Sequence, residues 1–429
     1  MKKKNSKMLL DTNGKPPLLK WILLSLQYVF AMFGATILVP ILVNSKAGSE
    51  VLSIPVALIS SGIGTLIYIL CTKGKSPVYL GSSFAYIAPM AVAAVKSGKA
   101  SVFTAIMGVG LVYTIVSLII KFAGKRWINK LLPPIIVGPM IMVIGLGLAP
   151  TAINEIGLDA EVIPWKNVVV ALVAFLTTAL VAIKGKGFIK VIPFLVGIIM
   201  GYIASMILGI VDYSGITSAK IFSIPAFYIP FVHYKLKFGA LLTILPIALV
   251  TMAEHIGDHK VLSSIIDKDL IEDPGLDKTL LGDGVATFAA GLIGGPANTT
   301  YGENTSVVGM TKVASVWVIG LAAIIAIIFG FLGQLTAVIS SIPTPVLGGV
   351  AILLYGFISV NGLKILIQNQ VDFGNTKNVI VASSMLVLGL GGAAISIATK
   401  NINVSISGMS LAAIVGILLN LIIPNEKEN

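Results

Sequence analysis

Carboxylates and histidines stand inside stretches of this sequence that are otherwise apolar. Glu254 lies within the apolar run 241–266, and Glu303 lies within the short segment 296–311. A helix rises about 1.5 Å per residue, so Glu254 lies near the middle of any bilayer that its run spans. An ionised carboxylate costs about 2.5–3.5 kcal/mol at that depth, which makes each acid a candidate functional residue. Two such acids suit proton coupling and recognition of N–H donors, although each could instead be a neutral acid bonded to a neighbouring helix.

The residues around Glu254 are also ionisable. Asp258 lies one helical turn away on the same face, so it could be a partner or proton relay for Glu254, or simply be hydrated near the membrane surface. His255 and His259 share another face at a spacing that could bind a metal. No third ligand is evident, so no metal site and no cofactor is predicted beyond the proton as coupling ion.

A polar stretch, 298–304, interrupts the apolar sequence beside Glu303. Irregular polar backbone at membrane depth survives only inside protein or along a watery cavity. Tyr301 here and Phe84 in an earlier interrupted segment offer aromatic faces for stacking, or they only pack. The Gly302 amide and the start of a half-helix offer N–H donors. Acceptors, donors and an aromatic face together match a small planar molecule with N–H and C=O groups, such as uracil.

The composition identifies the class of protein that must position these groups. Of 429 residues, 56% are hydrophobic and 11% are charged, and mean hydropathy is +0.98. Soluble domains carry about 25% charged residues, so we expect a multi-pass protein of the lipid bilayer. The net charge of +12 is scattered between apolar runs, which argues against nucleic-acid binding. The lone Cys71 cannot form an intrachain disulfide. The first apolar run is too long for a cleaved signal peptide, so we expect it to be the first span.

Apolar runs predict fourteen membrane spans. Twelve runs are continuous, and two shorter segments, 76–95 and 296–311, are interrupted by proline and glycine. The twelve are 21–43, 51–71, 101–120, 131–149, 167–183, 188–211, 238–266, 279–294, 314–339, 342–360, 378–395 and 405–423.

Basic residues predict the orientation of the chain. With an inside N-terminus, the inside segments of the first half carry fifteen Lys and Arg residues, and the alternate loops carry seven. This is the bias of cytoplasmic loops, so we expect both termini in the cytoplasm and the protein in the cytoplasmic membrane.

The two interrupted segments resemble each other in order and spacing. Each has a proline, then small polar residues with an aromatic, then a short apolar half-helix. Pro133-Pro134 and Pro343-Thr344-Pro345 each open a later span in the same relative place. Two halves of seven spans must have opposite membrane orientation, and paired broken spans point to a transport site near the midplane. The alternative is the general enrichment of glycine and proline in membrane helices.

Longer motifs carry a resemblance to a known family. The chain resembles the nucleobase–ascorbate transporters, also called the nucleobase:cation symporter-2 family, and looks most like the uracil-transporting members. The resemblance covers nearly the whole chain and is carried by 17–19, 25–27, 30–36, 79–85, 253–257 and 298–304.

The resemblance implies an all-α fold of fourteen segments in two inverted repeats of seven, with short antiparallel strands in segments 3 and 10. It implies a core domain (1–130 and 238–340) and a gate domain (131–237 and 341–429). It further implies proton symport, a homodimer and an elevator-like movement of the core against the gate.

The resemblance also assigns roles to residues. Glu254 and Glu303 would accept the ring N–H groups, and the backbone of Phe84 and Gly302 would contact a ring carbonyl. Tyr301 would lie beside the substrate, and Tyr355 matches a tyrosine of the gate domain.

The chain departs from the family pattern at several positions. The family's proton-linked histidine falls on Asp258, with His259 just beyond, so either could take that role. Ser306 replaces a glycine of the family signature, and Tyr28 replaces a histidine often found in the first span. Glu303 in place of glutamine favours uracil over xanthine or urate.

Several alternatives remain open from the sequence. Within the family they are a xanthine or purine permease and a sodium-coupled nucleobase symporter. In a different class, an anion channel or exchanger could share this architecture, but two buried acids argue against it. An intramembrane enzyme is not expected, because no nucleophile–base pair or metal-ligand set lies at membrane depth.

Overall fold

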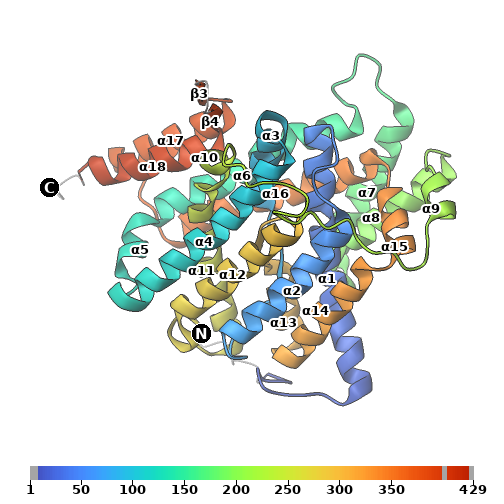
Figure 1. Ribbon diagram of the computed structural model, residues 1–429, viewed down its shortest axis with the longest axis horizontal. Helices are drawn as coiled ribbons and strands as arrows, with labels where there is room; N and C mark the ends of the chain where they lie inside the picture. Colours follow the sequence, from blue (N-terminus) through green and yellow to red (C-terminus); the bar gives the residue numbers. More distant parts are fainter. Residues whose placement is uncertain (1–7, 399–402, 425–429) are drawn as a thin grey trace.

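The computed structural model describes residues 8–398 and 403–424, and most of them are helical (Figure 1). The helices are α1 Leu18–Ala47, α2 Ile54–Cys71, α3 Ile87–Ser97, α4 Lys99–Ala123, α5 Arg126–Leu131, α6 Pro134–Ile156, α7 Trp165–Lys184, α8 Pro193–Ile207, α9 Ser214–Ser218, α10 Leu241–Ile244, α11 Ile247–Ile266, α12 Leu276–Ile293, α13 Gly302–Thr311, α14 Val316–Gly330, α15 Gly333–Ser340, α16 Thr344–Gln368, α17 Thr376–Leu390 and α18 Met409–Ile422. The strands are β1 Leu80–Ser82, β2 Asn298–Thr300, β3 Ala394–Ala398 and β4 Asn403–Ser407.

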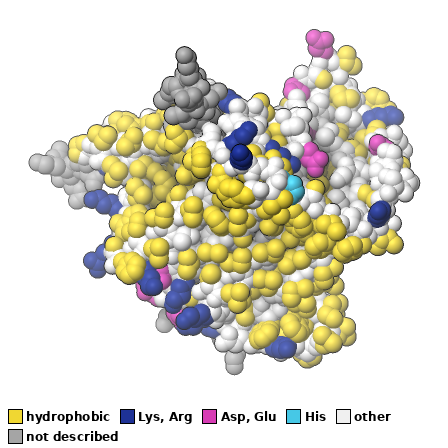
Figure 2. All heavy atoms as spheres, in the orientation of Figure 1, with side chains coloured by type: hydrophobic (Ala, Val, Ile, Leu, Met, Phe, Trp, Pro, Cys, Tyr) yellow, Lys and Arg dark blue, Asp and Glu magenta, His cyan; other side chains and the backbone are white. Residues whose placement is uncertain are grey.

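The helices have the length and surface of a multi-pass membrane protein. Seven helical segments of the described chain are long and apolar enough to cross a bilayer, and shorter apolar helices accompany them. On α7, Leu172, Leu176 and Leu180 recur every four residues and are each about half exposed. Figure 2 shows apolar side chains in a broad continuous field, with Lys and Arg gathered toward the lower left. Such a large apolar surface requires lipid around it.

Four predicted runs differ from the helices observed. The run 238–266 divides into α10 and α11 at Pro246, which has no N–H for a helical hydrogen bond. The run 314–339 divides into α14 and α15, between Gly330 and Gly333, where helix propensity is low. Between α17 and α18, the β3–β4 antiparallel hairpin replaces the ends of two predicted spans.

Helices from the two halves of the sequence are interleaved. Figure 1 shows α2 beside α12 and α14, and contacts between these helices agree; α12 also packs along α4. Elsewhere α6 packs along α16, where Gly145 approaches the carbonyl of Tyr355 so closely that a Cβ would lie 2.3 Å from it. The chain therefore places residues from both halves around one central region.

The two interrupted segments meet through β1 and β2. The strands are antiparallel, with Leu80 opposite Thr300 and Gly81 opposite Thr299. Each strand leads into a half-helix, β1 through the 3₁₀ turn Phe84–Tyr86 into α3, and β2 directly into α13. Backbone pairing satisfies the N–H and C=O groups that a non-helical segment would otherwise leave unpaired in the membrane. This antiparallel pair of β1 and β2, called the strand crossing below, fixes where both half-helices begin.

Candidate functional site

Three carboxyl groups gather around the start of α13. Glu254 and Asp258 lie one turn apart on α11, and Glu303 lies in the first turn of α13. The three groups act electrostatically on one another, and each residue is half-buried. The structure therefore brings together three of the predicted site residues.

The first turn of α13 offers backbone N–H donors beside the acids. No side chain caps the helix, and a Cβ at Gly302 would meet no heavy atom within 4 Å. The first N–H groups of a helix have no acceptor within the helix, and they carry its partial positive charge. Backbone donors at the exposed Gly302 and the acceptor Glu303 thus lie in the same turn of α13.

Asp258 also bonds directly to the strand crossing. Thr300, the last residue of β2, donates its hydroxyl proton to Asp258 Oδ2 at 2.5 Å. Of the two candidates for the family's proton-linked histidine, Asp258 therefore lies with the acid cluster and the strands.

His259 points elsewhere, into a buried polar chain. Its Nδ1 donates to the carbonyl of His255 at 2.7 Å, so its Nε2 accepts from the Tyr68 hydroxyl at 2.5 Å. The Tyr68 and Ser76 hydroxyls are 2.9 Å apart. Both histidine side chains are fully buried and their rings stack at 4.1 Å between centroids.

Asp283 is a further buried acid close to the cluster, and the sequence analysis did not predict it. It lies on α12, is fully buried, and its Oδ2 is 2.9 Å from His255 Nδ1. Its signal was present, because it is a carboxylate inside the predicted span 279–294. The flanking Gly282 and Gly284 allow Tyr68 and Tyr113 to pack tightly on either side of it.

Phe84 and Tyr301, the two predicted aromatic residues, have different surroundings. Phe84 is half-buried and lines a cleft of about 110 Å³ between α3, α6 and the start of α18. None of the clustered acids lines this cleft. Tyr301 is buried, its ring lies over Gly81, and its hydroxyl donates to the Ser82 carbonyl at 3.0 Å. In this conformation Tyr301 supports the crossing, and Phe84 is the more accessible ring.

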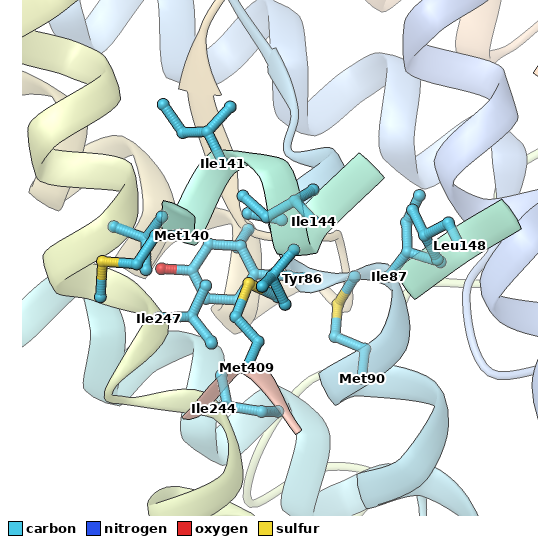
Figure 3. Close-up of a cluster of buried hydrophobic side chains, with 14 of the residues drawn as sticks. Tyr86, Ile87, Met90, Met140, Ile141, Ile144, Leu148, Ile244, Ile247 and Met409 are labelled. Carbon is cyan, nitrogen blue, oxygen red and sulfur yellow. The ribbon is translucent and has the colours of Figure 1, made fainter. Parts of the chain in front are cut away.

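Tyr86, two residues after Phe84, belongs to an apolar cluster, called the wall of the first segment below, and its hydroxyl lies close to one other hydroxyl. Figure 3 shows Tyr86 surrounded by side chains that include Met140, Ile144, Ile247 and Met409. The Tyr86 and Thr251 hydroxyls are 3.1 Å apart, which links the start of α3 to α11.

Two residues lie in the helix pair α6 and α16. Tyr355 is buried, and its hydroxyl has no hydrogen-bond partner among the described residues. The predicted run 131–149 left Glu155 outside the span, and this is wrong, because α6 continues to Ile156 and Glu155 is only 5% exposed. The predicted run 131–149 stopped too early because Thr151 and Asn154 lowered its hydropathy.

No metal site is found in the part of the chain that the structure describes, where no three His, Cys, Asp or Glu residues are arranged to hold an ion.

Comparison with solved structures shows the same fold in membrane transporters. The transmembrane domain of the cyanobacterial bicarbonate transporter BicA matches with a TM-score of 0.63 and 15% identity, over 94% of this chain and 98% of that one. The murine Slc26a9 anion transporter in its inward-facing state matches with a TM-score of 0.65 and 12% identity, over 95% of this chain and 68% of that one. At these identities the likeness concerns the fold alone.

Comparison of sequences finds much closer relatives. The uracil permease of Bacillus caldolyticus is 48% identical over 99% of this chain and 96% of its own length. The uracil permeases of Bacillus subtilis (strain 168) and Escherichia coli (strain K12) are 46% and 41% identical, over 98% and 96% of this chain and 97% and 93% of their own lengths. A family model described as "Permease family" matches residues 19–398. The chain therefore belongs to this permease family, the nucleobase–ascorbate transporters, which confirms the resemblance in its motifs and makes it a membrane transporter, not an enzyme.

Proposed function

We propose that this protein imports uracil across the cytoplasmic membrane by proton symport. The observation that carries the proposal is the cluster of Glu254, Asp258 and Glu303 around the uncapped start of α13. The relatives named as uracil permeases, which match along nearly their whole length, support uracil as the substrate.

The chemistry of the cluster fits a pyrimidine ring with two N–H and two C=O groups. Glu254 and Glu303 would each accept a ring N–H, since carboxylates are strong hydrogen-bond acceptors. The N–H groups at Gly302 and the backbone at Phe84 would contact the ring carbonyls. A site that pairs every polar atom of its ligand rejects analogues that leave one unpaired, which would give the specificity.

Proton coupling would arise from the crowding of the acids. Three carboxylates in a half-buried space repel one another, so holding a proton on one of them relieves the repulsion. Coupling requires that the core with uracil and a proton bound favours a different conformation from the core with an empty site. Binding of the neutral base together with a proton would meet this requirement.

For the architecture we propose fourteen segments in two inverted repeats, with both termini in the cytoplasm. The core (1–130 and 238–340) would slide against the gate (131–237 and 341–429), and two copies would form a homodimer. Exposure of Gly302, Ser306 and Met310 along α13 supports a site that opens toward the inner ends of α11 and α13. With an inside N-terminus, this is an inward-facing arrangement.

Uptake of radiolabelled uracil by cells that lack their own uracil transport tests the proposal. We expect uptake that a protonophore abolishes, that sodium removal leaves unchanged, and that unlabelled uracil inhibits better than xanthine or hypoxanthine. Sodium-dependent uptake that survives the protonophore would instead identify the sodium-coupled alternative. Stronger inhibition by xanthine would identify a purine permease, and bicarbonate transport without uracil transport would identify an anion carrier.

A further inference from the structure

One side-chain hydrogen bond joins the helix of the acid cluster to the strand crossing. Thr300 Oγ1 donates to Asp258 Oδ2 at 2.5 Å. Asp258 lies one turn beyond Glu254 on α11, and Thr300 ends β2. The bond therefore connects the helix that carries Glu254 to the strand that leads into Gly302 and Glu303.

Thr300 is held firmly at its own end of this bond. Its side chain is 3% exposed, and β1 pairs with it through Leu80. The next residue, Tyr301, donates its N–H to the Tyr79 carbonyl at 3.1 Å, and α13 then begins at Gly302. A displacement of the Thr300 side chain is consequently passed to the backbone that carries Gly302 and Glu303.

The neighbouring strand residue lacks such a bond. Thr299 is 4% exposed, and its hydroxyl has no hydrogen-bond partner among the described residues. The strand therefore contains two adjacent buried threonines, of which Thr300 bonds to an acid of the cluster and Thr299 does not.

We propose that Thr300 is a positioning residue for proton coupling, which fixes Asp258 Oδ2 against β2 so that protonation of Asp258 alters the junction between β2 and α13. The inference rests on the proposed proton symport. It assigns a role to a hydroxyl that neither binds the substrate nor carries the proton.

The surroundings of Asp258 make a neutral donor important. The groups that act on Asp258 are Glu254 from its own helix, Glu303 from α13 and Asp283 from α12, and all three are acids. His255 and His259 on α11 make their bonds to Asp283 and Tyr68 instead. The hydroxyl of Thr300 thus supplies a hydrogen bond to the carboxylate without adding a cation that would hold it permanently ionised.

A hydroxyl also suits both states of the acid. When Asp258 is ionised, Thr300 donates to Oδ2. When Asp258 carries its proton on Oδ2, the hydroxyl oxygen of Thr300 can accept a hydrogen bond from that O–H group, while the hydroxyl's own hydrogen points away. Serine can still donate and accept a hydrogen bond through its hydroxyl. Valine has nearly the shape of threonine but can do neither.

The test compares T300V, T300S and T299V in the full-length protein reconstituted into proteoliposomes. The measurement is the rate of uracil uptake as a function of pH, together with KM and maximal rate at each pH. For T300V we expect the pH midpoint of uptake to move upward by about one unit, a tenfold change in proton affinity, because the carboxylate loses a donor that stabilises its charged form. T300S and T299V should keep the wild-type midpoint.

Two results would overturn the inference. One is a wild-type pH midpoint in T300V, and the other is an equal shift in T300V and T299V, which would indicate a general effect of removing strand hydroxyls. If T300V does not fold, T300A gives the same comparison, and T300A/D258N must then behave as D258N alone. Wild-type uptake that does not respond to a proton gradient would instead contradict the proposed proton symport itself.

Discussion

The two interrupted segments share an architecture and differ in chemistry. In the first, β1 leads through the 3₁₀ turn Phe84–Tyr86 into α3, whose first residues are apolar and buried. In the second, β2 leads directly into α13, whose first residues are the exposed Gly302 and the half-buried Glu303. The first segment supplies a wall and the second supplies charge and open backbone donors.

Helix α11 bonds to both segments, one turn on either side of Glu254. Thr251 lies within hydrogen-bond distance of the Tyr86 hydroxyl from the first segment. Asp258 accepts from Thr300 of the second. Under the proposed function, the first segment serves packing and the second serves coupling, with the acid Glu254 between the two contacts.

The largest effect should follow loss of charge in the second segment. We expect E303Q and E254Q each to lower uracil uptake about 100-fold or more, because an amide cannot accept from a ring N–H as a carboxylate does and cannot carry the proton. Uptake of radiolabelled uracil, normalised to protein in the membrane, measures this. E161Q, at an exposed acid outside the site, should match wild type. Wild-type rates in both site variants would remove the acids from the mechanism.

A packing change at the crossing should come next. In G81A the new Cβ would lie 2.3 Å from Cζ of Tyr301, so the ring must move. We expect a loss of about 1–3 kcal/mol in stability and about tenfold lower uptake, since overpacking shifts both strands. Thermal unfolding in detergent and uptake measure the two effects. G356A, where a Cβ meets nothing within 4 Å, is the matched control and should change neither.

The wall of the first segment should be less sensitive. Y86F removes a hydroxyl 3.1 Å from that of Thr251, which still accepts from Tyr113 at 2.7 Å. We expect a cost of about 1 kcal/mol and a small rise in KM, with an unchanged pH profile of uptake. A shifted pH profile would mean that the first segment also takes part in coupling, and the comparison would fail.

The smallest effect concerns the C-terminal end of α13. The N-terminal segment bonds there, where Leu9 donates its N–H to the Lys312 carbonyl at 2.8 Å, and Lys268 binds Asp11 at 2.6 Å. The Lys268 ammonium and the Thr12 amide hold the pKa of Asp11 below its ordinary value. A lowered folded pKa stabilises the protein above the ordinary value of about 3.9, and this stabilisation is lost as pH falls through the folded value.

Because the Asp11 side chain is 60% exposed, water and salt screen this ion pair, and its contribution should be below about 1 kcal/mol. Thermal unfolding of D11N and wild type between pH 3 and pH 7 checks this, with a difference expected only toward pH 7. A difference that persists at pH 3 would point to the chain contacts rather than to the charge.

Much of this arrangement could be predicted from sequence, for identifiable reasons. A carboxylate in an apolar run is conspicuous, so Glu254 and Glu303 were found. The two interruptions are recognisable because proline and glycine break an apolar sequence, so both half-helices were predicted. The family motifs extended this to the strands and to the proton-linked position.

The sequence could not show which direction a side chain takes on a helix of nearly uniform hydropathy. Asp258 and His259 are adjacent, and only the packing of α11 sends one toward β2 and the other toward Tyr68. Asp283 was missed although it is a carboxylate inside a predicted span, and Glu155 was missed because the predicted run 131–149 ended before it. The β3–β4 hairpin was missed because its residues continue the apolar runs on either side.

Uracil accumulation driven by an imposed pH gradient in proteoliposomes tests the central claim most directly. With an acidic exterior, the purified protein should concentrate radiolabelled uracil inside, and E303Q should not. Uracil that only equilibrates across the membrane, at a rate indifferent to the gradient, would contradict proton coupling at this site.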